Sequence, residues 1–71
     1  MKKVVISFED IPDVLDVLES EEYSKYVSQE LIFNEEVQLF TVIVRGEHKA
    51  EEIVEEINRL GYESEILYYV G

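Results

Sequence analysis

Apolar residues in this chain recur at two different spacings, and the order in which those spacings alternate constrains the fold more than any other feature. Strand-like patterns, rich in β-branched and aromatic residues with a two-residue period, occupy four stretches: residues 3–8, 26–33, 37–45 and 62–70. Residues 12–22 and 48–60 instead carry apolar residues three or four apart, which is the period of a helix. The sequence therefore predicts the order strand, helix, strand, strand, helix, strand.

Local signals support the boundaries of these elements. Pro12 is tolerated only in the first turn of a helix, so the first helix is expected to begin there, with residues 23–25 as a linker after it. Residues 34–36 form a short polar segment between two predicted strands, which favours a hairpin. Gly61 directly follows the second helical stripe, where a left-handed cap is needed.

This order of elements is that of the ferredoxin-like fold, a split βαβ arrangement. We therefore expect an α+β protein with a four-stranded antiparallel sheet, its first and third strands at the centre and both helices on one face. A chain of 71 residues has room for one domain, so residues 1–71 are predicted to form a single ferredoxin-like domain.

The chain is strongly acidic, and its charge disfavours several kinds of partner. Seventeen Asp and Glu against six Lys and Arg give a formal net charge of -11. Nucleic-acid backbones and anionic membranes both attract clustered Lys and Arg, and no basic run here is longer than Lys2 and Lys3, so direct binding to either is not expected. A basic protein, a cation, a neutral or cationic small ligand and a second copy of the chain remain, unless the acidity serves solubility alone.

Motifs for catalysis or transport are missing from the sequence. The chain has no cysteine for a disulfide or a thiolate metal site, and its three glycines form neither a phosphate loop nor a nucleophile elbow. Its apolar runs are far shorter than the roughly 20 residues of a membrane span, and a signal-peptide pattern is lacking, so a cytoplasmic location is expected. We predict that the protein is not an enzyme, with an active site built from carboxylates at a subunit interface as the alternative.

Two features that resemble parts of metal sites lack the remaining parts. His48 is the only histidine, so it is expected to be an exposed turn residue. Glu9, Asp10, Asp13 and Asp16 suit the positive end of the first helix, but they lack the alternating ligands and central glycine of a calcium loop. The sequence therefore predicts neither a metal nor a cofactor.

The face of the predicted sheet that the helices leave open is apolar. If Val4, Ile6 and Phe8 face the helices, the open face is formed by the other alternating set: Val5, Leu39, Thr41, Ile43, Leu67 and Tyr69. Such a patch is larger than a monomer usually exposes, and a second copy related by a two-fold axis is its commonest cover. We therefore expect a homo-oligomer, with a dimer through this face as the first expectation, unless a different register makes the face less apolar.

A second candidate surface lies on the predicted helices and is rich in carboxylates. Its members are Asp13, Asp16, Glu19, Glu51, Glu52, Glu55 and Glu56. These residues either form an ordinary solvated helix surface or present a double row of charges that imitates DNA phosphates. The second interpretation describes an acidic inhibitor or adaptor that binds a basic protein. It is the alternative to a small non-enzymatic binding or regulatory module that self-associates through its open sheet face or its sheet edges.

The segment AEEIVEEINRLGYE, residues 50–63, resembles the second helix and following turn of heavy-metal-associated domains, which are small ferredoxin-like copper carriers. That family holds metal through two cysteines after the first strand, and residues 8–12 here contain none. The resemblance therefore implies the fold and argues against soft-metal transport. The element order is also similar to that of ACT-type regulatory modules, which pair their sheets into dimers.

Overall fold

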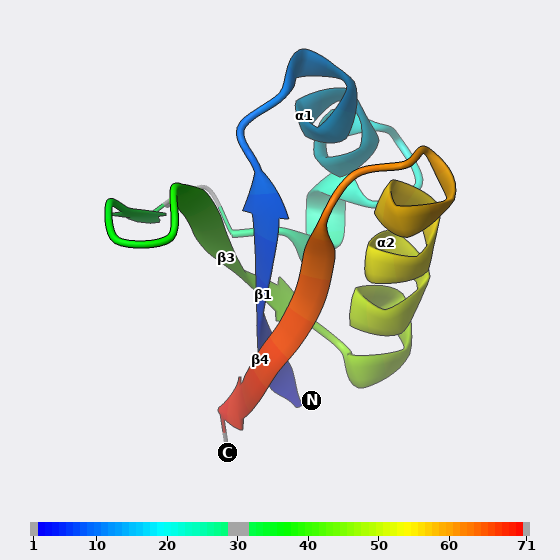
Figure 1. The fold of residues 1–71 in the computed structure, drawn as a ribbon. Helices are drawn as coiled ribbons and strands as arrows, with labels where there is room; N and C mark the ends of the chain where they lie inside the picture. The colour runs from blue at the N-terminus through cyan, green and yellow to red at the C-terminus, as the bar shows by residue number, and fades with distance from the viewer. Residues whose placement is uncertain (1, 29–31, 71) are drawn as a thin grey trace.

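The computed structural model describes residues 2–28 and 32–70, and it confirms the predicted order of elements (Figure 1). The elements are β1 (Lys3–Glu9), α1 (Pro12–Glu19), η1 (Ser24–Tyr26, a 3-10 helix), β2 (Ile32–Asn34), β3 (Leu39–Arg45), α2 (Glu47–Arg59) and β4 (Ser64–Val70). The strands form one antiparallel sheet in the order β2-β3-β1-β4, and α1 and α2 pack together on one face of it. This is the α+β ferredoxin-like arrangement that the periodicity predicts.

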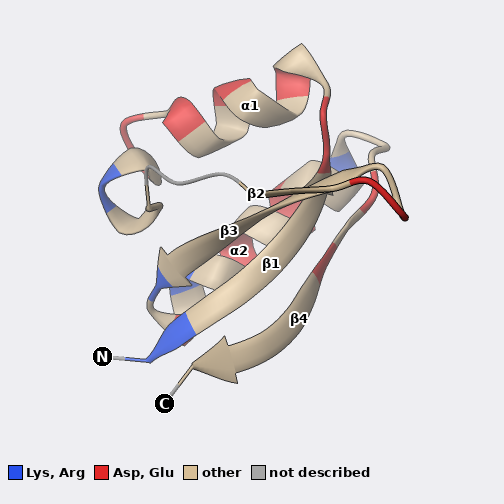
Figure 2. Cartoon of the chain, turned by 90° about the vertical axis from the view of Figure 1, so that its left-hand side faces the viewer, with Lys and Arg blue, Asp and Glu red and all other residues tan. Residues whose placement is uncertain are grey.

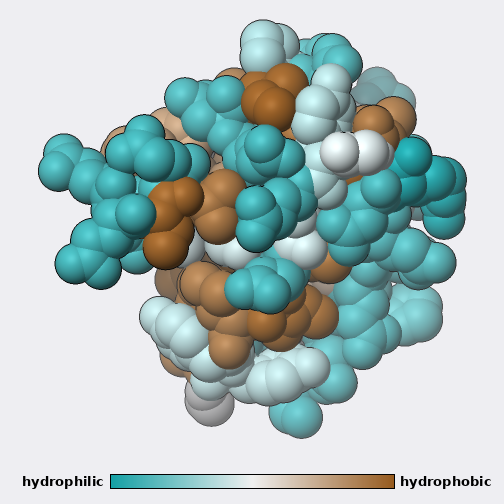
Figure 3. All heavy atoms as spheres, viewed as in Figure 1, coloured by the Kyte–Doolittle hydropathy of each residue, from teal (hydrophilic) through white to brown (hydrophobic). Residues whose placement is uncertain are grey.

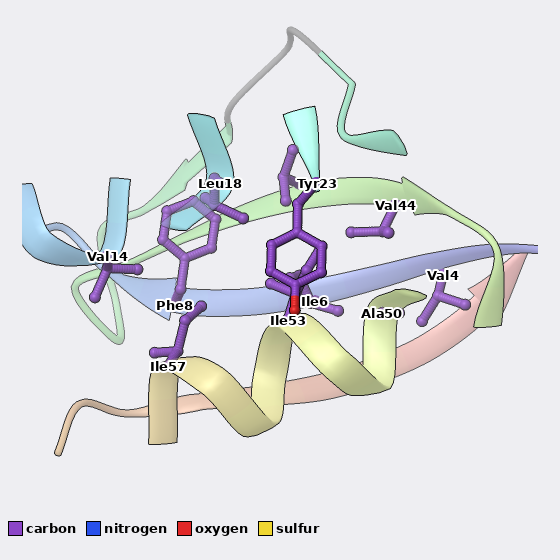
Figure 4. Close-up of a cluster of buried hydrophobic side chains, with 11 residues drawn as sticks. Val4, Ile6, Phe8, Val14, Leu18, Tyr23, Val44, Ala50, Ile53 and Ile57 are labelled. Carbon is purple, nitrogen blue, oxygen red and sulfur yellow. The ribbon is translucent and has the colours of Figure 1, made fainter. Parts of the chain in front are cut away.

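The core lies between the helices and the sheet (Figure 4). Alternation in β1 directs Val4, Ile6 and Phe8 toward the helices, and each is fully buried. Ile53 and Ile57, one turn apart on α2, meet them from the other side. Each such side chain contributes about 1.5–3 kcal/mol on burial, so this layer supplies most of the driving force for folding.

Helix α2 ends in the left-handed cap that Gly61 predicts. Gly61 has φ +95°, its N–H donates to the carbonyl of Asn58 at 3.0 Å, and the N–H of Tyr62 donates to the carbonyl of Ile57 at 3.2 Å. These two bonds satisfy carbonyls that the end of a helix otherwise leaves without donors. The cap also reverses the chain toward β4.

Helix α1 begins at Pro12 as predicted, but it ends at Glu19 rather than at residue 22. Both the N–H and the hydroxyl of Ser20 bond to the carbonyl of Val17, at 3.3 and 2.8 Å, and this local bonding competes with further helix. The predicted linker over residues 23–25 is also wrong, because Tyr23 enters the core with 8% exposure and η1 follows it.

The strand predicted over residues 26–33 is shorter than expected. β2 begins at Ile32, residues 29–31 lie outside the described part of the chain, and Val27 forms only an isolated bridge with Val44. The hairpin turn spans residues 35–38 instead of 34–36, so it starts one residue later and ends two residues later than predicted. The Oδ1 atom of Asn34 accepts the N–H of Glu36 at 3.0 Å, and the side-chain amide of Gln38 donates to the carbonyl of Glu35 at 2.7 Å, so the turn extends to residue 38. As a result β3 begins at Leu39 and not at residue 37.

Strand β4 begins at Ser64 rather than at residue 62, and it contains a bulge that the sequence does not reveal. Ile6 of β1 pairs with Ile66, whereas the preceding residue Val5 pairs with Tyr68. Leu67 is therefore an extra residue in the ladder. Beyond it, every side chain of β4 lies on the face opposite to the one that simple alternation assigns.

Candidate functional site

The strongest candidate site is the face of the sheet that the helices do not cover. In Figure 2 this face is toward the viewer, with β3, β1 and β4 in front of α2. Pairing places Val5 opposite Ile43, and Ser7 opposite Thr41, at its centre. Ile43 is 38% exposed and Tyr68, on β4, is 58% exposed. The open face is thus accessible at Ile43 and Tyr68, whereas Val5 and Ser7 of the central strand are buried between their neighbours.

The bulge corrects the prediction that Tyr69 belongs to this face. Tyr69 pairs with Val4, a core residue, so its side chain lies on the helix-covered side of the sheet. The Nζ atom of Lys2, which is ion-paired with Glu47 at the start of α2, lies 5.4 Å from the centre of the Tyr69 ring. The extra residue at Leu67 brings Tyr68 to the open face in place of Tyr69.

The other residues predicted for the open face differ in accessibility. Val5 has the expected orientation but is only 7% exposed, because it lies in the central strand between two neighbours. Leu39 and Thr41 are half-buried, and Leu67 at the bulge is 43% exposed. Apolar side chains gather over the lower part of β4 in Figure 3, bordered by hydrophilic ones. The accessible apolar area is therefore largest along β4 and the outer part of β3.

Two further residues lie on the open face, and the prediction from the sequence did not include them. Val70, 39% exposed, pairs with Lys3 and joins Tyr68 on the open side beyond the bulge. Ile32 of β2 pairs with Thr41 and is 65% exposed. The orientation of Val70 depends on the bulge, which the sequence does not reveal. Ile32 precedes Phe33, which pairs with Phe40 on the covered side, so alternation along β2 directs Ile32 to the open face.

The two ends of the open face carry opposite charge. Lys3 and Arg45 are paired at one end, while Glu9 pairs with Leu39, and Glu65 with Ser7, toward the other. Figure 2 shows the basic residues at the end where the N-terminus lies and acidic ones at the opposite end of β1 and β4. The face is therefore an apolar band between a basic and an acidic end.

The carboxylates predicted as an acidic helix surface are partly neutralised by neighbours. Glu52 is ion-paired with Lys49 at 3.1 Å. Arg59 contacts Glu56 at 2.6 Å and Glu55 at 3.8 Å. On α1, Asp13 accepts a hydrogen bond from the hydroxyl of Tyr62 at 3.1 Å, whereas Asp16, Glu19 and Glu51 are exposed.

Lys49 of α2 makes electrostatic contacts with two tyrosines at η1. Its Nζ atom lies 5.7 Å from the ring centre of Tyr23 and 5.3 Å from that of Tyr26, within cation–π range. The hydrogen bond to Glu52 raises the pKa of Lys49 above its usual value. Burial, and then the charges of Glu22 and neighbouring acids, raises the pKa of the Tyr23 hydroxyl. These contacts hold Tyr23 and η1 against α2.

Among the residues that the structure describes, no group of three or more His, Asp or Glu side chains is placed to hold a metal ion. His48 is exposed as predicted, although it lies in the first turn of α2 rather than in a turn. Of the acids near α1, Glu9 accepts the backbone N–H of Glu63 at 2.5 Å. In the described part of the chain, neither helix is long and apolar enough to cross a membrane.

Comparison with families of known proteins, with curated proteins and with solved structures found no match for this chain.

Proposed function

We propose that this protein is a small non-enzymatic binding module that associates with a second copy of itself through the open face of its sheet. The observation that carries the proposal is the layout of that face, an apolar band with a basic end and an acidic end. Flat apolar bands bounded by charge are typical of interfaces, where burial supplies affinity and charge supplies orientation.

The charge layout favours one orientation of the two copies. A two-fold axis lying between the sheets and perpendicular to the strands reverses the strand direction, so the basic end of one copy meets the acidic end of the other. Lys3 would then lie near the acidic end that Glu9 and Glu65 mark on the second copy. A face with a single sign of charge would repel its own copy, whereas this one is self-complementary.

The rival function, imitation of nucleic acid by the helices, has weaker support. A mimic presents an uninterrupted array of negative charge to a basic partner. Here Lys49 and Arg59 lie among the carboxylates of α2 and neutralise Glu52 and Glu56. The open face shows no comparable internal neutralisation, because its opposite charges lie at opposite ends of the sheet.

Sedimentation of the parent chain and two variants at the same concentrations tests the proposal. Ile43→Lys places a charge in the centre of the apolar band, and we expect it to weaken association at least tenfold because that charge loses its hydration in the interface. Asn58→Lys adds the same charge on an exposed position of α2 and should leave association unchanged. A parent chain that stays monomeric up to millimolar concentration, or an Ile43→Lys variant that associates like the parent, would refute the proposal.

A charge-reversal pair tests the orientation. Lys3→Glu should weaken association, and adding Glu65→Lys in the same chain should restore it, because the two ends exchange their signs. If the double variant associates less than either single variant, the antiparallel orientation is wrong.

A further inference from the structure

A pocket at the basic end of the molecule collects half of the chain's basic residues. It has a volume of about 460 Å³ and is lined by Lys3 of β1, Arg45 of β3 and Lys25 of η1. The chain has only six Lys and Arg in all. None of the described residues that line the pocket is acidic, although acids outnumber bases seventeen to six in the sequence.

The three pocket cations differ from the other three basic residues in their pairing. Lys2, Lys49 and Arg59 each form an ion pair with a glutamate. Over residues 2–28 and 32–70, the three cations of the pocket form none. The Nζ atom of Lys25 lies 5.5 Å from the ring centre of Tyr26, a contact that leaves its positive charge without a carboxylate. Three cations without a carboxylate partner make a locally positive site, and such a site attracts an anion.

The fold holds two of these cations against their mutual repulsion. Lys3 and Arg45 are direct cross-strand partners on the open face, and like charges in that position destabilise a sheet. A guanidinium N–H of Arg45 donates to the backbone carbonyl of Lys25, which fixes the side chain beside the pocket and leaves its other N–H donors for a ligand. A bound anion would relieve the repulsion between Lys3 and Arg45.

The other walls of the pocket indicate what kind of anion fits. The hydroxyl-bearing residues Ser24 and Ser28 line it, and so do the apolar residues Val27 and Ile43. Arginine forks and lysines bind phosphate oxygens, the hydroxyl of Ser24 adds a neutral donor, and apolar walls receive a carbon skeleton. The volume lies within the range of about 300–1,000 Å³ that is typical of small-molecule sites.

We propose that this pocket binds a small phosphate monoester whose organic part is apolar, through Lys3, Lys25 and Arg45. The two negative charges of a phosphate monoester match a site of three cations better than a single carboxylate does. The inference goes beyond self-association, and the two surfaces overlap only at Lys3, Ile43 and Arg45. Lys25 lies outside the sheet, so it separates the two in an experiment.

Titration of the ¹⁵N-labelled chain with phenyl phosphate, followed by amide chemical shifts, tests the proposal. We expect saturable shifts at Lys25, Ile43 and Arg45, weaker binding of inorganic phosphate, and no saturable shifts with phenol. Lys25→Gln should weaken phenyl phosphate at least fivefold. Lys2→Gln changes the net charge equally at an ion-paired site outside the pocket, so it should have little effect.

Two results would overturn the assignment. One is a set of shifts that sodium chloride reproduces at equal ionic strength, which would show only general screening. The other is an equal loss of affinity in Lys25→Gln and Lys2→Gln. Leu39→Lys separates this proposal from the dimer, because Leu39 lies at the acidic end of the open face and outside the pocket. A monomeric Leu39→Lys variant that still binds phenyl phosphate supports the pocket independently, and one that has lost binding contradicts it.

Discussion

The two faces of the sheet are built from the same strands but differ in burial. On the covered face, Val4, Ile6 and Phe8 are fully buried under the helices. On the open face, Ile43 and Tyr68 remain exposed, although they are as apolar as many core residues. The difference teaches that alternation in a strand determines which residues share a face, while the number of covering elements determines which face forms the core. The second face is then available for association.

The largest expected loss of stability comes from removing a buried side chain from the covered face. Phe8→Ala should lower the free energy of unfolding by about 3–5 kcal/mol, because it removes a fully buried ring and leaves a cavity. That is comparable to the whole stability expected for a core of this size. Circular dichroism should show an unfolded chain at 37 °C, while Ile53→Val in the same cluster should lose only about 0.5–1.5 kcal/mol and stay folded.

Tyr68→Ala is the matched change on the open face. It should alter the stability of the monomer by less than about 1 kcal/mol, since the side chain is already 58% exposed. Urea unfolding at a concentration where the chain is monomeric measures both faces on one scale. Equal losses from Phe8→Ala and Tyr68→Ala would contradict the distinction between a core face and a free face.

A smaller effect is expected where α2 is positioned over the covered face. Gly61→Ala should cost about 1–2 kcal/mol, because the left-handed conformation with φ +95° disfavours a Cβ atom. Apart from Gly61 and its two chain neighbours, none of the described residues has an atom within 4 Å of the position that the new Cβ would take, so steric contact adds nothing. Gly61→Asn should recover part of the loss in urea unfolding, and a neutral Gly61→Ala would show that the cap does not hold the helix.

Two buried serines on opposite faces sharpen the comparison further. The hydroxyl of Ser64, on the covered face, donates to the carbonyl of Ser7 at 2.7 Å, so Ser64→Ala should cost about 1 kcal/mol. The hydroxyl of Ser7, on the open face, is buried without a partner among the described residues. Ser7→Ala should therefore be neutral or slightly stabilising in urea unfolding. The reverse order would mean that the open-face hydroxyl is satisfied and the covered one is not.

The smallest expected effect is a loss of stability at alkaline pH. The hydrogen bond to Asp13 raises the pKa of Tyr62, and burial raises that of Tyr23, from the usual 10.0. In the folded chain these hydroxyls keep a proton that the unfolded chain loses, so stability is full below about pH 10 and falls as the pH rises through the folded values. Urea midpoints should therefore decrease between about pH 9 and 11, and less so in Tyr23→Phe. An equal decrease in both proteins would exclude Tyr23 as a cause.

Most of the fold was predictable because its signals are local. Pro12 and Gly61 mark the helix boundaries that the structure confirms, and the spacing of Ile53 and Ile57 marks the face of α2 that enters the core. The errors arose where side chains compete with the backbone. Ser20 ended α1 early, and Gln38 extended the hairpin turn, because their side chains bond to nearby backbone groups.

The candidate sites were less predictable, because they depend on pairs of distant residues. The predicted open face was correct in Ile43 and incorrect in Tyr69, since one bulge at Leu67 reverses the alternation of β4. The basic pocket gave no signal, because Lys3 lies 22 residues before Lys25 in the sequence, and Lys25 lies 20 residues before Arg45. A search for basic runs cannot find cations that meet only across a sheet.

The sequence by itself determined the order of the elements, the core side of β1 and α2, and the acidic surface. Periodicity and turn residues act over a few neighbouring positions, so they can be recognised from the sequence alone. The tertiary structure alone decided the position of the bulge, the exchange of Tyr69 for Tyr68 and the meeting of Lys25 with Arg45. The physical reason is that register and cross-strand contact depend on how distant segments fit together, and several pairings satisfy the same local pattern.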